Sequence, residues 1–271
     1  MPLPILQTTT APTPENLLRL FHRTELHWVR HVGEEAQLDA GVAFTNADMP
    51  GVWDGNMMID AAVPPGGTAQ DAEREVNEHF AAAGTACLRW LMNPSAPEAQ
   101  TRPLVDHLMA TGWTRWVNDV MYLAGSPTSP IQEVSGLTII PARASFRHAR
   151  VLAEEAAAGW NEPHLAEASM LHLDDPHWDA LLALSDGKAV ARAGVLAVGD
   201  IGRVEHVFVS EPFRNRGIGR TMMSRVLEIC ARSLFKHVML CVNPTNRVAI
   251  DLYEKLGFRK IGQMTPYIRR A

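Results

Sequence analysis

The sequence predicts an α/β (α+β) protein of two domains, each with a mixed, largely antiparallel central sheet flanked by helices. Its 271 residues exceed the roughly 100 to 200 residues of one domain. Glycine, proline and serine crowd at residues 124–130, between two regions of regular hydrophobic patterning. In the second region, short β-rich runs give way to helical spacing. We therefore expect domains at residues 1–124 and 137–271, joined by a linker at 125–136.

The C-terminal half has turn or cap signals at the ends of its expected elements. Asp186-Gly187 and Gly199-Asp200 separate three β-rich runs, which predicts an antiparallel meander. Asn243 suits a helix N-cap, Pro244 the first helical position, and Gly257 the helix end. The expected elements are a strand at 137–140, a helix at 145–159, strands at 178–185, 188–198 and 203–209, a helix at 219–234, a strand at 237–242, a helix from 244 to 257, and strands at 258–261 and 266–269.

Charge is unevenly distributed along the chain. The formal net charge is −5, yet residues 201–271 hold 13 Lys or Arg against 5 Asp or Glu. A basic segment in an acidic chain favours a small polyanionic ligand, although a basic face without a ligand has the same composition. The acidic balance argues against a nucleic-acid partner. No apolar run reaches the roughly 18 residues of a membrane span, and no signal core follows Met1, so we expect no membrane partner and a cytoplasmic location.

A glycine-containing loop joins the strand at 203–209 to the following helix. It reads Arg214-Asn215-Arg216-Gly217-Ile218-Gly219, with Arg220 next. A helix N-terminus has unpaired N–H groups and positive potential, and glycine lets a diphosphate approach them closely. The arginines add charge-assisted contacts. The loop therefore predicts a phosphate cradle, with a plain turn that starts a helix as the alternative.

Two motifs around this loop resemble those of the GNAT superfamily of acetyltransferases. Residues 204–219 resemble the family's signature segment, and residues 243–258 resemble its second motif, Asn-x-x-Ala-x-x-Leu-Tyr-x-x-x-Gly-Phe. The resemblance covers about 135 residues. It implies that acetyl-CoA is the co-substrate, that no metal is needed, and that strand backbone pairs with the pantetheine amides. The cofactor-binding residues that it implies are Val207, Phe208, Val209, Arg214, Asn215, Arg216, Gly217, Ile218, Gly219, Arg220, Asn246, Ala249 and Tyr253.

Acetyl transfer to an amine needs a group that takes the amine's proton and a group that protonates the leaving thiolate. Glu205 is the candidate base, and we expect residues 205, 207 and 209 to share one strand face. Tyr253 is the candidate acid, since helical spacing places Asn246 and Tyr253 on one face. The alternatives are an ordinary exposed Glu205 and a Tyr253 that only packs against Phe258.

The acceptor is expected to be an amine of a small molecule or peptide. Trp160 and Glu162 lie in the loop where the resemblance places the acceptor pocket. The acceptor's identity and the oligomeric state stay open. Two other functions also stay open: a CoA-binding regulatory module without turnover, and transfer of a different acyl group.

The N-terminal half contains a faint copy of the C-terminal pattern. Asn93-Pro94, a helix at 103–111 and Gly112-Trp113 parallel the order of the second motif. The loop that corresponds to the phosphate cradle, residues 63–71, has two prolines, an aspartate and no arginine. We therefore expect a degenerate, non-catalytic GNAT-like domain. In this half His22, His27 and His31 have no metal-site context, so no metal site is expected.

Overall fold

The structure of the protein is a computed structural model that describes residues 12–125, 134–160 and 162–269. Most of the expected linker lies outside these residues. The helices are α1 (Pro14–Arg30), α2 (Ala69–Ala82), α3 (Glu98–Ala110), α4 (Phe146–Trp160), α5 (His164–Leu171), α6 (Ile218–Arg232) and α7 (Arg247–Lys255). The strands are β1 (Glu34–Leu38), β2 (Gly41–Thr45), β3 (Met57–Ala61), β4 (Arg89–Met92), β5 (Thr114–Arg115), β6 (Asn118–Leu123), β7 (Leu137–Pro141), β8 (Trp178–Ser185), β9 (Lys188–Val198), β10 (Ile201–Val209), β11 (His237–Val242), β12 (Phe258–Met264) and β13 (Tyr267–Ile268).

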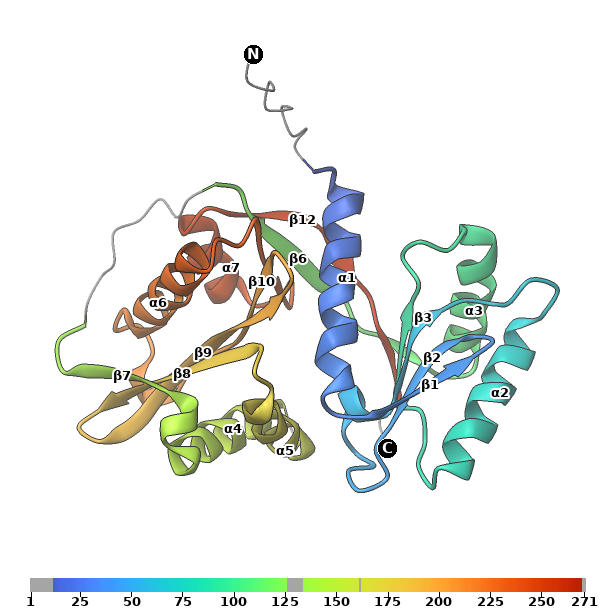
Figure 1. The fold of residues 1–271 in the computed structure, drawn as a ribbon, viewed down its shortest axis with the longest axis horizontal. Helices are drawn as coiled ribbons and strands as arrows, with labels where there is room; N and C mark the ends of the chain where they lie inside the picture. The colour runs from blue at the N-terminus through green and yellow to red at the C-terminus, as the bar shows by residue number, and fades with distance from the viewer. Residues whose placement is uncertain (1–11, 126–133, 161, 270–271) are drawn as a thin grey trace, which may run out of the picture.

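Two sheets of similar design form the two halves of the molecule (Figure 1). In one, β1, β2 and β3 are antiparallel neighbours, and α2 then leads to β4, which is parallel to β3. In the other, β8, β9 and β10 form the antiparallel meander, and α6 leads to β11, which is parallel to β10. The expected fold, two largely antiparallel sheets flanked by helices, is confirmed.

The halves exchange strands. β6 precedes the linker in the chain, yet it lies between β11 and β12 of the seven-stranded sheet. β13, at the C-terminal end, lies between β4 and β5 of the six-stranded sheet. The sheets therefore do not divide at residues 124–137 as expected, because spacing alone does not reveal which sheet a short strand joins.

Helix α1 lies between the two halves (Figure 1). The Thr13 side chain caps it by accepting a hydrogen bond from the N–H of Asn16. Its buried Leu17, Phe21 and Val29 belong to one apolar cluster that also contains residues of β3 and β10. Since this cluster takes residues from both sheets, α1 helps to join them into one core.

Most expected boundaries in the C-terminal half agree with the structure. The expected strands at 178–185, 188–198 and 237–242 coincide with β8, β9 and β11. The expected helix start at Asn243 is wrong: the Asn243 side chain closes a turn with the N–H of Thr245 at 2.9 Å, and Asn246 caps α7 instead. None of the described helices is long and apolar enough to cross a membrane.

Candidate acyl-transfer site

The loop between β10 and α6 has the backbone of a phosphate cradle. Asn215 and Gly217 adopt left-handed conformations, with φ of 61° and 82°. Gly217 is the N-cap of α6 and offers no side-chain hydrogen bond. The side chain of Arg214 donates from Nε to the Val209 carbonyl at 3.0 Å, and the Arg216 guanidinium lies over the Phe213 ring at 5.3 Å. No side chain of the described residues caps this helix start, so its N–H groups are available to an anionic ligand.

Gly219 shows that this surface is shaped for close approach. A Cβ at Gly219 would lie 3.6 Å from a methyl of Val209 and 3.7 Å from a methyl of Leu252, which are ordinary van der Waals contacts. Its φ is not in the left-handed region. The packing therefore tolerates a larger residue at this position. Glycine here leaves room beside the helix N-terminus, as a bound diphosphate requires.

Strand β10 has an edge that continues beyond its pairing with β11. The parallel ladder runs only from Ile201 to Val204 of β10, although β10 extends to Val209. A bulge begins where the ladder ends: His206 has φ of 56°, and His206 and Val207 together lie opposite a single residue of β9. β11 therefore does not pair with residues 205–209 of β10. On that edge the Val209 carbonyl accepts from the Arg214 side chain, and the residues before it offer backbone to which an extended amide-bearing molecule can bind.

The bulge overturns the expected face of Glu205. Val204, Val207 and Val209 pack against the apolar cluster of α6, whereas Phe208 packs on the α4 side. Glu205 instead contacts Arg203 on the α1 side. The expectation that residues 205, 207 and 209 share a face is wrong, because one extra residue in the strand shifts the alternation.

Glu205 ends a chain of buried charges that crosses between the halves. Arg203 donates to Glu205 at 2.6 Å and to Glu25 of α1 at 2.5 Å. Glu25 also pairs with Arg89 of β4 at 2.9 Å, and Arg89 pairs with Asp54. Burial raises the pKa of Glu205, and the Arg203 charge only partly opposes that rise. A carboxyl with a raised pKa is suited to accept a proton near neutral pH.

Tyr253 lies on α7, with only 6% of its surface exposed. Burial and the charge of nearby Glu205 raise the pKa of Tyr253, so its hydroxyl keeps its proton at neutral pH. Its ring centroid is 6.1 Å from that of Phe258, so the tyrosine also packs as the alternative reading expected. Asn246 caps α7 by accepting from the N–H of Ala249 at 3.2 Å, which leaves its amide N–H groups for other partners.

A cavity of about 140 Å³ lies on the other side of the bulge. Its wall includes Trp28 of α1, Arg192 of β9, His206 of β10 and residues of α4 and α5. Burial lowers the pKa of Arg192 to about 10, which still leaves a cation at neutral pH. Within the described residues, its buried Nε has no hydrogen-bond partner, and no carboxylate pairs with its guanidinium. The sequence analysis missed Arg192, because an arginine in an otherwise apolar strand gives no sign of the cavity that it lines.

Of the two expected acceptor residues, only Glu162 has a described side chain. Trp160 ends α4, and its side chain lies outside the described residues. Glu162 follows it, and its N–H donates to the Ala157 carbonyl at 3.2 Å. Among the described residues, Glu162 is not part of the wall of the cavity beside Arg192.

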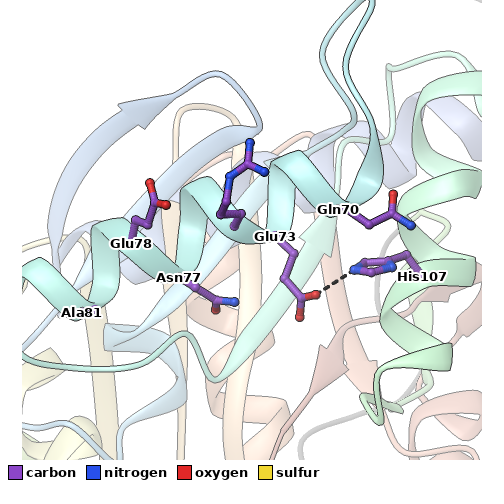
Figure 2. A pocket seen from close by; sticks show the side chains of 7 residues that line it. Gln70, Glu73, Asn77, Glu78, Ala81 and His107 are labelled. Carbon is purple, nitrogen blue, oxygen red and sulfur yellow. Dashed lines mark hydrogen bonds and ion pairs between the residues drawn. The ribbon is translucent and has the colours of Figure 1, made fainter.

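The corresponding loop of the N-terminal half, between β3 and α2, has a different end. The Thr68 side chain caps α2 by accepting from the N–H of Asp71. A hollow of about 440 Å³ lies beside α2, and Figure 2 shows side chains that line it. There Glu73 pairs with His107 of α3 at 2.7 Å. Arg74, the one arginine among the described residues that line the hollow, pairs with Asp71 at 2.6 Å. A capped helix and a paired arginine suit a diphosphate poorly.

Comparisons with known proteins agree with this geometry. Residues 146–258 match the family model described as the acetyltransferase (GNAT) family. The chain is 28% identical over 113 residues to N-alpha-acetyltransferase RimI of Mycobacterium tuberculosis, covering 40% of this chain and 70% of that protein. It is 40% identical over 60 residues to N-alpha-acetyltransferase 50 of Danio rerio, covering 22% of this chain and 36% of that protein. The chain thus spans only about a third of that last relative.

Solved structures extend the likeness in fold to both halves. A GCN5-related N-acetyltransferase from Kribbella flavida has a TM-score of 0.61 at 16% identity, covering 93% of this chain and 95% of that chain. A functionally unknown conserved protein from Staphylococcus epidermidis has a TM-score of 0.61 at 14% identity, covering 88% and 94%. At these identities the likeness shows the fold alone. Residues 146–258 are thus an acetyltransferase domain of the GNAT family, in a chain whose two halves form a GNAT-like two-domain fold.

Proposed function

We propose that this protein transfers an acetyl group from acetyl-CoA to the amine of a small acceptor that also carries a carboxylate. The observation that carries the proposal is the edge of β10 at residues 205–209, with which β11 does not pair. At one end this edge leads to the glycine loop of α6. At the other lie Glu205 and, close enough to feel its charge, Tyr253.

The residues of the C-terminal half fit acetyl-CoA along its length. The N–H groups at the start of α6, with Arg214, Arg216 and Arg220, hold the pyrophosphate. The β10 backbone pairs with the amides of the pantetheine arm, and the free amide of Asn246 adds a donor beside it. When bound, acetyl-CoA supplies a thioester whose carbonyl carbon an amine can attack.

Two side chains carry out the proton transfers of the reaction. Glu205 accepts the proton that the attacking amine loses, and its raised pKa suits that role. Tyr253 holds a proton for the departing sulfur, since burial keeps its hydroxyl protonated. His206 is a poorer base than Glu205, because burial and the Arg192 charge hold its pKa well below the usual value.

The half-buried Arg192 supports an acceptor with an anionic group. An arginine without a partner in a small cavity loses much of its hydration. A ligand carboxylate that makes a bidentate contact with the guanidinium compensates for this loss. The two curated relatives are named as N-alpha-acetyltransferases, which favours an α-amine as the reacting group. An amine with a neighbouring carboxylate satisfies both features.

We also propose that only the C-terminal half is catalytic. The N-terminal half contributes α1, whose Trp28 lines the acceptor cavity and whose Glu25 holds the arginine beside Glu205. It therefore shapes the active half and carries no second cofactor site.

The direct test measures free CoA with a thiol reagent across a panel of amines, and identifies products by mass spectrometry. The proposal expects acetylated product with at least one carboxylate-bearing amine. Binding of acetyl-CoA without product across the panel would favour a regulatory module instead. Product from a longer acyl-CoA at a higher kcat/KM than from acetyl-CoA would favour transfer of another acyl group.

A further inference from the structure

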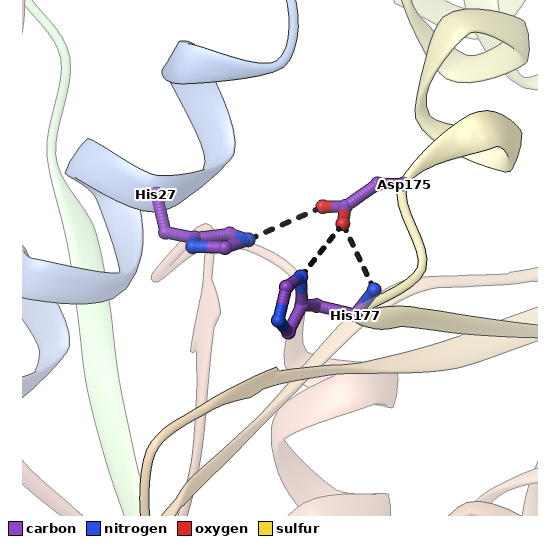
Figure 3. A group of neighbouring side chains, drawn as sticks. All are labelled: His27, Asp175 and His177. Carbon is purple, nitrogen blue, oxygen red and sulfur yellow. Dashed lines mark hydrogen bonds and ion pairs between the residues drawn. The ribbon is translucent and has the colours of Figure 1, made fainter.

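Two histidines and an aspartate meet at the junction of the halves. His27 comes from α1, and Asp175 and His177 precede β8 (Figure 3). The Nε2 of His27 is 3.3 Å from Oδ2 of Asp175, and Nδ1 of His177 is 3.2 Å from Oδ1. One donor atom from each residue lies within 4.8 Å of the other two. The cluster is thus small enough for one ion to touch all three.

Two other histidine–carboxylate pairs are closer, whereas His164 and Glu167 lie 4.0 Å apart. His22 pairs with Asp60, and His107 with Glu73, at 2.7 Å in both cases. The two separations at Asp175 are longer, near the limit of a good hydrogen bond of about 3.2 Å. Zinc–ligand distances of about 2.0 to 2.1 Å place neighbouring donors of a tetrahedron about 3.3 Å apart. The two separations are therefore compatible with those of metal ligands, and the 3.2 Å pair of His177 and Asp175 is also a hydrogen bond.

The buried carboxylate of Asp175 has an oxygen that a cation could bind. The side chain of Asp175 is only 3% exposed. Its Oδ2 is buried and accepts no hydrogen bond within the described residues. One carboxylate and two imidazoles form a donor set suited to zinc.

The site is held in place on one side and open on the other. The backbone N–H of His177 donates to Oδ1 of Asp175 at 2.9 Å, which fixes the carboxylate. The His177 side chain is 56% exposed, so an ion can enter from solvent and keep a water as its fourth ligand.

We propose that His27, Asp175 and His177 bind a divalent transition-metal ion, zinc by preference, that fastens α1 to the start of β8. The ion joins the two halves at a point close to the acceptor cavity, because Trp28 follows His27 and lines that cavity. A structural zinc of this kind holds the cavity wall in position and does not require a part in acetyl transfer.

The test uses the full chain without an affinity tag, freed of metal by a chelator. Isothermal titration with zinc should give one site per chain with a micromolar or tighter Kd, and cobalt should give the visible absorption of a tetrahedral site. His177→Ala and Asp175→Asn should each weaken binding at least tenfold and remove the rise in melting temperature that zinc causes.

His107→Ala is the matched control, since it removes another histidine–carboxylate pair and should leave zinc binding unchanged. The exposed position of His177 makes its alanine variant foldable, and circular dichroism without metal checks this. No saturable zinc binding to the parent chain, or equal binding by the parent and His177→Ala, would overturn the proposal.

Discussion

Arg203 of β10 and Glu25 of α1 form an ion pair across the two halves, with 2.5 Å between Nη2 and Oε1. Both side chains are almost fully buried, at 5% and 2% exposure. Arg203 also holds Glu205, so the contact that joins the halves sets the environment of the proposed base. The stability of the junction and the proposed role of Glu205 therefore depend on the same arginine.

Glu25→Gln should lower the free energy of unfolding by about 3 to 5 kcal/mol, because it leaves two buried arginines without their shared carboxylate. Urea denaturation measures this. The control is Glu98→Gln, which removes an exposed pair with Arg102 and should cost less than about 1 kcal/mol. Equal changes in the two variants would contradict a structural role for the buried network.

The same carboxylate predicts a dependence of stability on pH. Burial would raise the pKa of Glu25, but Arg203 and Arg89 outweigh it, and the net pKa is lowered. Its stabilising contribution is therefore complete above the unfolded pKa of about 4.3 and is lost as pH falls through the lower folded value. Below about pH 4, the parent chain should lose more stability than Glu25→Gln does.

Glu205→Gln should lower kcat/KM by about 10²- to 10⁴-fold, because the variant cannot take the amine's proton. In the parent chain, kcat/KM should rise with pH as the carboxyl, whose pKa burial raises, loses its proton. The variant should lack this rise. If kcat/KM of Glu205→Gln still rises with pH as in the parent chain, the ionisation belongs to another group.

Tyr253→Phe should lower kcat by at least about tenfold while the Kd for acetyl-CoA stays within about twofold, since the ring still packs against Phe258. The control is Tyr122→Phe, which removes the hydroxyl of a half-buried tyrosine on β6. That variant should keep full activity. If Tyr253→Phe is as active as the parent, the tyrosine only packs against its neighbours and does not protonate the leaving thiolate.

Arg192→Gln should raise the KM of a carboxylate-bearing acceptor by about 10- to 100-fold, the value of a lost charged hydrogen bond. The KM of the same amine without its carboxylate should not change. Arg192→Lys should recover part of the loss. The glutamine variant should be at least as stable as the parent, because the half-buried charge that it removes has no carboxylate partner among the described residues. The same rise for both acceptors would contradict carboxylate recognition.

The sequence predicted those parts of the site that depend on local geometry. The loop from Arg214 to Gly219 and the position of Tyr253 follow from a strand, a tight turn and two helices that are neighbours in the chain. Their glycines and caps leave a direct trace in the order of residues.

The sequence does not indicate the features that depend on contacts between residues far apart in the chain. The left-handed His206 shifts the face of Glu205, and nothing in the residue type requires that conformation. The partners Glu25 and Arg203 are far apart in the chain, as are His27 and Asp175, and strand exchange brings β6 and β13 into sheets that their position does not indicate. The spacing of residues predicts which side chains share a face of one helix or strand, but it does not predict contacts between distant elements.

The most direct measurement is isothermal titration of acetyl-CoA into the parent chain, Gly219→Ala and Gly159→Ala. A methyl at Gly219 fits the fold, and a methyl at Gly159 of α4 meets nothing within 4 Å, so both variants should fold. The account predicts one site per chain, at least a tenfold weaker Kd for Gly219→Ala, and an unchanged Kd for Gly159→Ala. Two sites per chain, no binding to the parent, or equal binding by all three proteins would contradict it.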